Sequence, residues 1–209
     1  SVLGMAYLRS GKVEPALKLL EKGHELCRSS KVQFVYPYAA GSLGYAYLLT
    51  NEPLHALSIL EEGTKPGNLE GAVWTIHPLT VLADIYRALG ETALATETVS
   101  HALSFADESE ERGFEAWAML VMGKIKAEAG RSEEAEEWYR RALQHSSNLL
   151  MRPLAAHCHE GLGHFYLKSG KNEEARSELV AAIELYRIMD MAFWLPKAES
   201  ALAEVSGSA

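Results

Sequence analysis

Apolar residues recur along the chain at helical spacing, and turn residues and small residues return at a longer, fixed interval. Turn-forming residues stand 40, 39, 40 and 40 positions apart, at Gly11, Asn51, Gly90, Gly130 and Gly170. Five positions after each turn comes an alanine, at Ala16, Ala56, Ala95, Ala135 and Ala175. Seven positions further on comes a second small residue, at Gly23, Gly63, Ala102, Ala142 and Ala182. Chance does not hold three such columns in register, so the chain is predicted to contain about five copies of one structural unit.

Each unit is predicted to be a hairpin of two antiparallel helices. The apolar residues before each turn have the period of a helix, and no segment alternates like a strand. Glycine and asparagine accept the left-handed backbone that ends a helix. Ser132 and Asn172, each followed by two glutamates, are expected to cap the second helices of their units. Residues 63–71 and 107–113 are expected to be the longer links between units.

The prediction is therefore an all-α chain of eleven helices without a sheet, forming a single domain. The repeats are expected at about 1–29, 30–66, 67–108, 109–148 and 149–189, followed by a capping helix at about 191–205. Trp74, Trp138 and Trp194 are expected to be packing anchors. Replacing a column alanine by a larger residue should overpack two closely spaced helices.

Four of the five first helices share a motif of leucine, a small residue and, three positions later, an aromatic residue; the fourth unit has Met122-Gly123 and Lys126 instead. It occurs as Leu3-Gly4 with Tyr7, Leu43-Gly44 with Tyr47 and Leu162-Gly163 with Tyr166. Together with the glycine turn and the two small-residue columns, this motif resembles the tetratricopeptide repeat (TPR) over nearly the whole chain. The unit of about 40 residues is longer than the usual 34 of that family. The resemblance implies a right-handed superhelical solenoid of antiparallel helix hairpins.

Long units of this kind also resemble the C-terminal sensor or interaction regions of bacterial signalling proteins, of the nucleotide-cyclase/ATPase or transcriptional-regulator type. The closing stretch at residues 186–195 resembles the tail of those proteins. The implied function is that of a noncatalytic scaffold in a larger signalling protein, of which this chain is expected to be a fragment. It would bind a peptide, a partner domain or a small effector, and the partner could be the rest of its own polypeptide.

The register of the family assigns particular side chains of the first helices to the concave groove. A row of aromatic residues with polar groups between them suits a peptide or small-ligand site. The candidate binding residues are Tyr38, Ser42, Tyr45, His77, Thr80, Asp84, Arg87, Trp117, Leu120, Lys124, His157, Glu160, His164 and Lys168. The carboxylate clamp of chaperone-binding relatives is not expected, because Tyr45, Asp84, Lys124 and His164 stand where that clamp has asparagine.

Composition limits the partners. The 209 residues carry 20 Lys and Arg against 28 Asp and Glu, a formal charge of −8, which argues against direct nucleic-acid binding. The sequence contains no run of about 18 apolar residues that would predict a membrane span, and no signal peptide is visible. A cytoplasmic protein is therefore expected. The only cysteines, Cys27 and Cys158, are expected to be buried thiols in a reducing compartment.

The sequence predicts no enzyme and no cofactor. It contains no phosphate-binding loop, no CxxC pair and no ordered Ser/His/Asp set. His159 and His164 are five positions apart and diverge around a helix, unlike the pair in zinc proteases. His157, Glu160 and His164 share one helical face, so a metal-dependent or small-molecule activity there is the alternative function. Hydrogen-bonded histidines on a polar face are the favoured interpretation, and no metal is predicted.

The N-terminal end of the solenoid is expected to expose an apolar face that favours association. Leu3, Tyr7 and Leu8 belong to a hairpin without a preceding repeat, so their apolar face should lie open. Self-association through this edge or through the groove, giving a homo-oligomer, is therefore expected.

Overall fold

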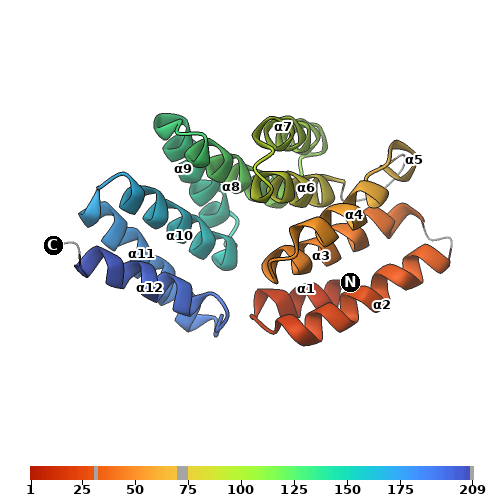
Figure 1. Ribbon diagram of the computed structural model, residues 1–209, viewed down its shortest axis with the longest axis horizontal. Helices are drawn as coiled ribbons and strands as arrows, with labels where there is room; N and C mark the ends of the chain where they lie inside the picture. Colours follow the sequence, from red (N-terminus) through yellow and green to blue (C-terminus); the bar gives the residue numbers. More distant parts are fainter. Residues whose placement is uncertain (31–32, 70–74, 208–209) are drawn as a thin grey trace.

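The computed structural model describes residues 1–30, 33–69 and 75–207, and in these ranges the chain is helical without a strand. The helices form an arch of stacked hairpins (Figure 1). The elements are α1 (Val2–Arg9), α2 (Val13–Ser29), the 3₁₀ turn η1 (Gln33–Val35), α3 (Tyr36–Leu49), α4 (Pro53–Gly63), α5 (Pro66–Leu69), α6 (Ile76–Ala88), α7 (Thr92–Ser109), α8 (Arg112–Glu128), α9 (Ser132–Asn148), α10 (Arg152–Lys168), α11 (Asn172–Ile188) and α12 (Leu195–Gly207). The predicted solenoid with a C-terminal capping helix is confirmed.

The hairpins pair α1 with α2, α3 with α4, α6 with α7, α8 with α9 and α10 with α11. All five predicted turn residues adopt the left-handed backbone, with φ between 63° and 82°. The five column alanines of the second helices are fully buried. The sequence columns therefore correspond to one repeated packing arrangement.

Close approach of the two helices in a hairpin depends on a small residue in the first helix. It contacts a large residue of the second helix sixteen positions later. A Cβ added at Gly44 would lie 2.3 Å from Leu60 Cδ1, and one added at Gly163 would lie 2.6 Å from Leu179 Cγ. Gly4 has the same relation to Leu20. A larger side chain at these positions would push the helices apart.

Several details of the prediction are wrong. The described residues contain twelve α-helices, because the expected link after Gly63 includes the short helix α5. The expected link at 107–113 shrinks to two residues, since Glu110 takes a left-handed backbone (φ 56°) and turns the chain at once. Ser132 and Asn172 are the first helical residues, preceded by Arg131 and Lys171 without a side-chain cap. Trp74 lies outside the described residues.

The capping helix begins later than expected. Residues 191–194 form a turn in which Met191 and Trp194 are buried, and α12 follows it from Leu195. The backbone N–H of Trp194 donates to the carbonyl of Met191 at 3.0 Å. No helix within the described ranges combines the length and hydrophobicity that a membrane span needs.

The two ends of the solenoid meet. A Cβ added at Gly11, in the turn after α1, would lie 2.7 Å from the backbone nitrogen of Phe193. Leu49 of the second hairpin packs against the cluster around Trp194. Figure 1 shows the arch returning on itself, with the turn between α11 and α12 beside α1. The concave face is therefore enclosed from both ends instead of forming an open groove.

The apolar face predicted at the N-terminal edge is exposed only in part. Leu8 is fully buried, because α1 packs against α2 and α3 and places it in the core of the first two hairpins. Tyr7 is half-buried. Val2 and Leu3 are 72% and 58% exposed, so an apolar edge remains, but it is smaller than the sequence indicates.

Candidate functional site

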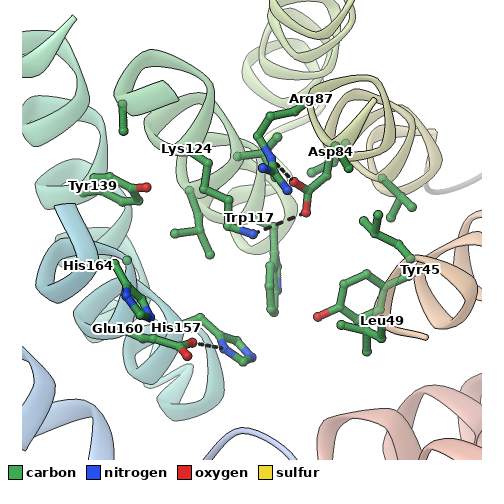
Figure 2. Close-up of a pocket in the computed structure, with 18 of the residues that line it drawn as sticks. Tyr45, Leu49, Asp84, Arg87, Trp117, Lys124, Tyr139, His157, Glu160 and His164 are labelled. Carbon is green, nitrogen blue, oxygen red and sulfur yellow. Dashed lines mark hydrogen bonds and ion pairs between the residues drawn. The ribbon is translucent and has the colours of Figure 1, made fainter. Parts of the chain in front are cut away.

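A cavity of about 690 Å³ occupies the inside of the arch. Its walls come from the first helices α3, α6, α8 and α10, with α1 and the turn before α12 completing the enclosure. Figure 2 shows side chains from several of these helices converging on one space. Residues far apart in the sequence thus form one site.

Twelve of the fourteen candidate residues line this cavity. They are Tyr45, His77, Thr80, Asp84, Arg87, Trp117, Leu120, Lys124, His157, Glu160, His164 and Lys168. Ser42 does not, because its side chain is fully buried and its hydroxyl donates to the carbonyl of Tyr38 at 2.8 Å. Tyr38 lies behind the wall and packs against the ring of His77, with centroids 5.0 Å apart.

A charged cluster joins α6 to α8 on one wall. The carboxylate of Asp84 accepts from Arg87 Nε at 2.6 Å and from Lys124 Nζ at 3.3 Å. Arg87 also donates to Glu128 at 2.5 Å. Burial disfavours the charged carboxylate, but Lys124 and Arg87 outweigh burial, so the pKa of Asp84 lies below its ordinary value. The cluster is therefore a fixed, internally paired part of the wall.

A second polar group joins α10 to α11. Tyr186 donates its hydroxyl to Glu160 Oε2 at 2.7 Å, and its oxygen lies 2.7 Å from His157 Nδ1. The tyrosine hydrogen is directed to Glu160, so this geometry assigns the Nδ1 proton to His157. Burial lowers the pKa of His157, and its contact with Glu160 offsets this only in part.

The proposed metal face is not supported. Within the ranges that the structure describes, no group of three His, Cys, Asp or Glu side chains is placed to hold a metal ion. His157 and Glu160 already share the hydroxyl of Tyr186, while His164 lies on the exposed part of the cavity wall. His159 points to the other side of α10 and pairs with Glu178 at 2.6 Å.

Four aromatic rings cross the cavity and are called the aromatic row: Tyr45, Trp117, His157 and Trp194. Neighbouring ring centroids are 6.5 Å, 5.6 Å and 4.6 Å apart in that order. The row runs from α3 through α8 and α10 to the turn before α12. Figure 2 shows Trp117 between Tyr45 and His157. Such rings offer apolar contact area to a bound molecule.

Three notable wall residues were missed from the sequence: Arg9, Trp194 and Lys197. Trp194 is a packing anchor as expected, but it also lines the cavity. Arg9 could have been found from Lys168. Both stand two positions before a turn residue, and that whole column lines the cavity: Arg9, Leu49, Ala88, Glu128 and Lys168. No pattern of the repeat locates Trp194 and Lys197, which enter because the arch closes.

The architecture defines an α-solenoid repeat protein with a ligand-sized cavity on its inner face. Residues 74–148 match one sequence profile of the tetratricopeptide repeat, and residues 156–188 match a second. The chain therefore contains tetratricopeptide repeats, as the sequence columns indicated. Proteins built from this repeat generally mediate protein–protein interaction, and their fold is typically noncatalytic.

Solved structures of the same architecture are distant in sequence. BtubC (BKLC) from P. vanneervenii is 14% identical, with a TM-score of 0.61 over 95% of this chain and 86% of that chain. The apo form of RapI is 15% identical, with a TM-score of 0.62 over 98% of this chain and 56% of that chain. The nearly identical TPR-like repeats from Podosopora anserina are 18% identical, with a TM-score of 0.53 over 88% and 91%. No curated protein sequence matches the chain. At such identities these similarities concern the fold alone.

Proposed function

We propose that this chain is a noncatalytic interaction module that holds a short polypeptide segment in its central cavity. The observation that carries the proposal is the enclosed space of about 690 Å³ on the inner face. Ligand sites commonly have about 300–1,000 Å³, which admits a short segment or a small effector and excludes a folded domain. Among these, a peptide agrees best with the protein partners that tetratricopeptide repeats generally bind.

The cavity wall offers both apolar and polar contacts to a bound segment. The aromatic row provides apolar faces for side chains of the segment, with Trp117 at its centre. The paired charges of Asp84, Arg87 and Lys124 offer hydrogen-bonding groups that are already held in place, so binding need not order them. The wall residues predicted from the sequence, His164 and Lys168 included, form the proposed binding surface.

The absence of catalysis is part of this proposal. Three acidic or histidine side chains of the cavity are engaged in structural pairs: Asp84 with two cations, and His157 and Glu160 through Tyr186. A peptide bound here would find these groups as fixed donors and acceptors. The module also needs no cofactor for this role.

The test is selection from a library of random hexapeptides by the wild-type protein and by a variant with a blocked cavity. Ala88→Trp places a large ring in the cavity from an exposed position on α6. Ala93→Trp is the matched control, because Ala93 is exposed on α7 and does not line the cavity. We expect the wild type and Ala93→Trp to retain the same peptides and Ala88→Trp to lose them. Retention by Ala88→Trp, or no retention by any form, would contradict the proposal.

Affinities for a selected peptide then locate the site. Trp117→Ala should cost about 2 kcal/mol or more if the ring is a binding hot spot. Arg87→Ala should weaken binding less, because the cluster is already paired internally. Glu137→Ala, on the exposed face of α9, should leave binding unchanged. A loss confined to Glu137→Ala would place the partner on the convex face.

We further propose that the module serves a larger signalling protein of the bacterial cytoplasm, whose own polypeptide could supply the bound segment. The resemblance of residues 186–195 to the tail of such proteins supports this context. Both cysteines are free, which is compatible with a reducing compartment, although Cys27 is half-buried and only Cys158 is fully buried. The sequence encoded upstream of Ser1 tests it: the absence of a signalling domain there would contradict this context.

Self-association through the N-terminal edge is the last part of the proposal. Val2 and Leu3 are both mainly exposed at the end of the stack. Buried against a second copy, they would gain apolar contact. Light scattering should show a concentration-dependent rise in mass that Leu3→Glu abolishes. A strict monomer at high concentration would contradict self-association without affecting the cavity.

A further inference from the structure

The first hairpin, α1 with α2, buries fewer residues than any of the other four. Its two helices contain three and two buried residues, whereas α3 and α4 of the second hairpin contain ten and three. The remaining three hairpins resemble the second in this respect. Segments with few buried apolar contacts open at a lower free energy than the rest of a protein. The α1–α2 hairpin is therefore the hairpin that separates most easily from its neighbours.

The attachment of this hairpin is stronger on its outer side than on its inner side. The outer helix α2 packs along α3, and Tyr47 of α3 donates its hydroxyl to Glu21 of α2 at 2.8 Å. The inner helix α1 has only a small contact with α3, although α3 packs extensively on α6 and α6 on α8. Met5 and Leu8 of α1 line the cavity. A rotation about the α2–α3 contact would therefore move α1 away and uncover the cavity.

The opposite side of the seam is firmly packed. Residues 191–194 form a turn in which Met191 and Trp194 are buried in one apolar cluster with α10 and α11. The half-buried ring of Phe193 packs against Trp194, with centroids 4.9 Å apart. Leu49 at the end of α3 packs against the same cluster. The second hairpin and the C-terminal end thus form one frame, and Figure 1 shows α1 beside it.

The first hairpin touches this frame at Gly11. A Cβ added there would lie 2.7 Å from the backbone nitrogen of Phe193 and 2.8 Å from its Cβ. The equivalent turn glycines, Gly90, Gly130 and Gly170, have no described atom within 4 Å of an added Cβ. In the described ranges, no backbone hydrogen bond joins the turn at Gly11 to the turn at Phe193. The two turns can therefore separate without losing such a bond, and they meet only because residue 11 has no side chain.

We propose that the α1–α2 hairpin is a lid, which closes the cavity when the turn at Gly11 docks against Phe193 and opens by rotation about the α2–α3 contact. The inference rests on the proposed function, because it states how a peptide segment enters the cavity. In the closed position, α1 and the turn before α12 both belong to the cavity wall. A segment that contacts both sides favours the closed state, so binding should shift the lid towards closure.

Lid motion can be measured without a ligand, as the distance between two nitroxide spin labels. Lys18→Cys on α2 and Ser200→Cys on α12 carry the labels, because both residues are exposed and neither lines the cavity. The native thiols are removed by Cys27→Ser and Cys158→Ala. Pulsed EPR of this parent protein should give a short and a long distance, for the closed and the open lid. Adding a hexapeptide selected by the wild type should favour the short distance.

Two glycine variants of the labelled parent protein test the contact between the turns. Gly11→Ala places a methyl group against the backbone of Phe193 and should shift the population to the long distance. Gly130→Ala is the matched control, because its backbone is similarly left-handed (φ 73° against 76°) and its Cβ has no neighbour. It should leave the distances unchanged. One distance common to the parent protein and both variants would overturn the lid, whatever the cavity binds.

A disulfide across the seam then tests whether the lid controls entry. Gly11→Cys with Phe193→Cys places two Cβ atoms about 2.8 Å apart, and a small movement gives the roughly 3.5–4.5 Å of a disulfide. Neither residue lines the cavity. A non-glycine residue can occupy this turn position, because the equivalent Asn51 has φ 63°. The association rate of a hexapeptide selected by the wild type should fall at least tenfold on oxidation and recover on reduction. Gly11→Cys alone should not respond to oxidation.

Dissociation distinguishes a closed lid from a damaged site. Peptide bound before oxidation should leave the locked protein at least tenfold more slowly, whereas damage to the site would speed its release. Equal association rates before and after oxidation, with the disulfide verified by mass spectrometry, would overturn the lid as the route of entry. If the wild type retains no hexapeptide, the proposed function fails, and the EPR distances of Gly11→Ala and Gly130→Ala decide the lid alone.

Discussion

The inner and outer helices of the hairpins lie in very different environments. The inner helices α3, α6, α8 and α10 contain ten, nine, nine and eight buried residues. The outer helices α4, α7, α9 and α11 contain three, four, four and five. An inner helix packs against its own outer helix and against both neighbouring hairpins. Its only remaining surface faces the cavity.

This difference explains where function can lie. Polar groups that are buried on an inner helix are either paired, as Asp84 is, or left without a partner at a cost in free energy, as His77 Nε2 is. Polar groups on an outer helix are solvated and tolerate change. The buried stripe of the outer helices is narrow, and its column alanines allow close packing but offer no binding chemistry.

The largest expected effect comes from removing a buried side chain of an inner helix. Leu162 of α10 is fully buried, so Leu162→Ala should cost about 2–5 kcal/mol of unfolding free energy. Val180 of α11 is 39% exposed, and Val180→Ala should change stability by about 0.5 kcal/mol or less. Urea denaturation of both variants measures the difference. Similar losses would show that the outer helices are as tightly constrained as the inner ones.

The next effect concerns buried and exposed charge. Asp84→Asn leaves Arg87 and Lys124 without their shared anion and should cost about 2 kcal/mol, less than for a fully enclosed pair because both cations are partly solvated. Glu199→Gln breaks an exposed pair with Arg187, 2.5 Å long, and should cost at most about 0.5 kcal/mol. Equal losses at neutral pH would contradict the special environment of the inner face.

The pH dependence of Asp84→Asn follows from the lowered pKa of Asp84. A carboxyl group whose pKa is lower in the folded state stabilises that state above its ordinary pKa of 3.8. That stability is lost as pH falls through the lowered value. The difference between wild type and Asp84→Asn should thus stay constant at neutral pH and narrow below about pH 4. A difference that grows on acidification would show that the pKa of Asp84 is raised instead.

The repeat pattern predicts local structure well because each column reflects a short-range physical demand. Gly130 marks a left-handed turn, and Ala135 marks the closest approach of two helices, so both are recognisable without knowing the rest of the fold. Most of the residues that line the cavity could also be predicted, because equivalent positions in successive inner helices face the same side of the solenoid. Arg9 was missed only because the first repeat was left out when the candidate positions were assigned; Arg9 is the equivalent of Lys168 in that repeat.

The remaining features depend on the superhelix as a whole. Gly11 meets Phe193 only because small rotations between five hairpins add up to a closed arch, and no local pattern encodes that sum. Trp194 therefore could be predicted as an apolar anchor but not as a wall of the cavity. The short link before Arg112 was also missed, because it depends on Glu110 adopting a backbone that non-glycine residues rarely take.

The smallest expected effects distinguish the two kinds of turn that join inner and outer helices. The turn from α8 to α9 places Gly130 at φ 73°, with no neighbouring atom within 4 Å of an added Cβ. Gly130→Ala should therefore cost about 1 kcal/mol, entirely from the left-handed backbone.

The turn from α9 to α10 instead places Leu150 at φ 55°, where its side chain is 83% exposed. Leu150→Gly should relieve the same strain and lose little packing. Because glycine also loses more chain entropy on folding, the net gain should be only about 0.5 kcal/mol. Urea denaturation of the two variants measures both signs, and destabilisation by Leu150→Gly would show that this leucine is held by contacts that outweigh its backbone strain.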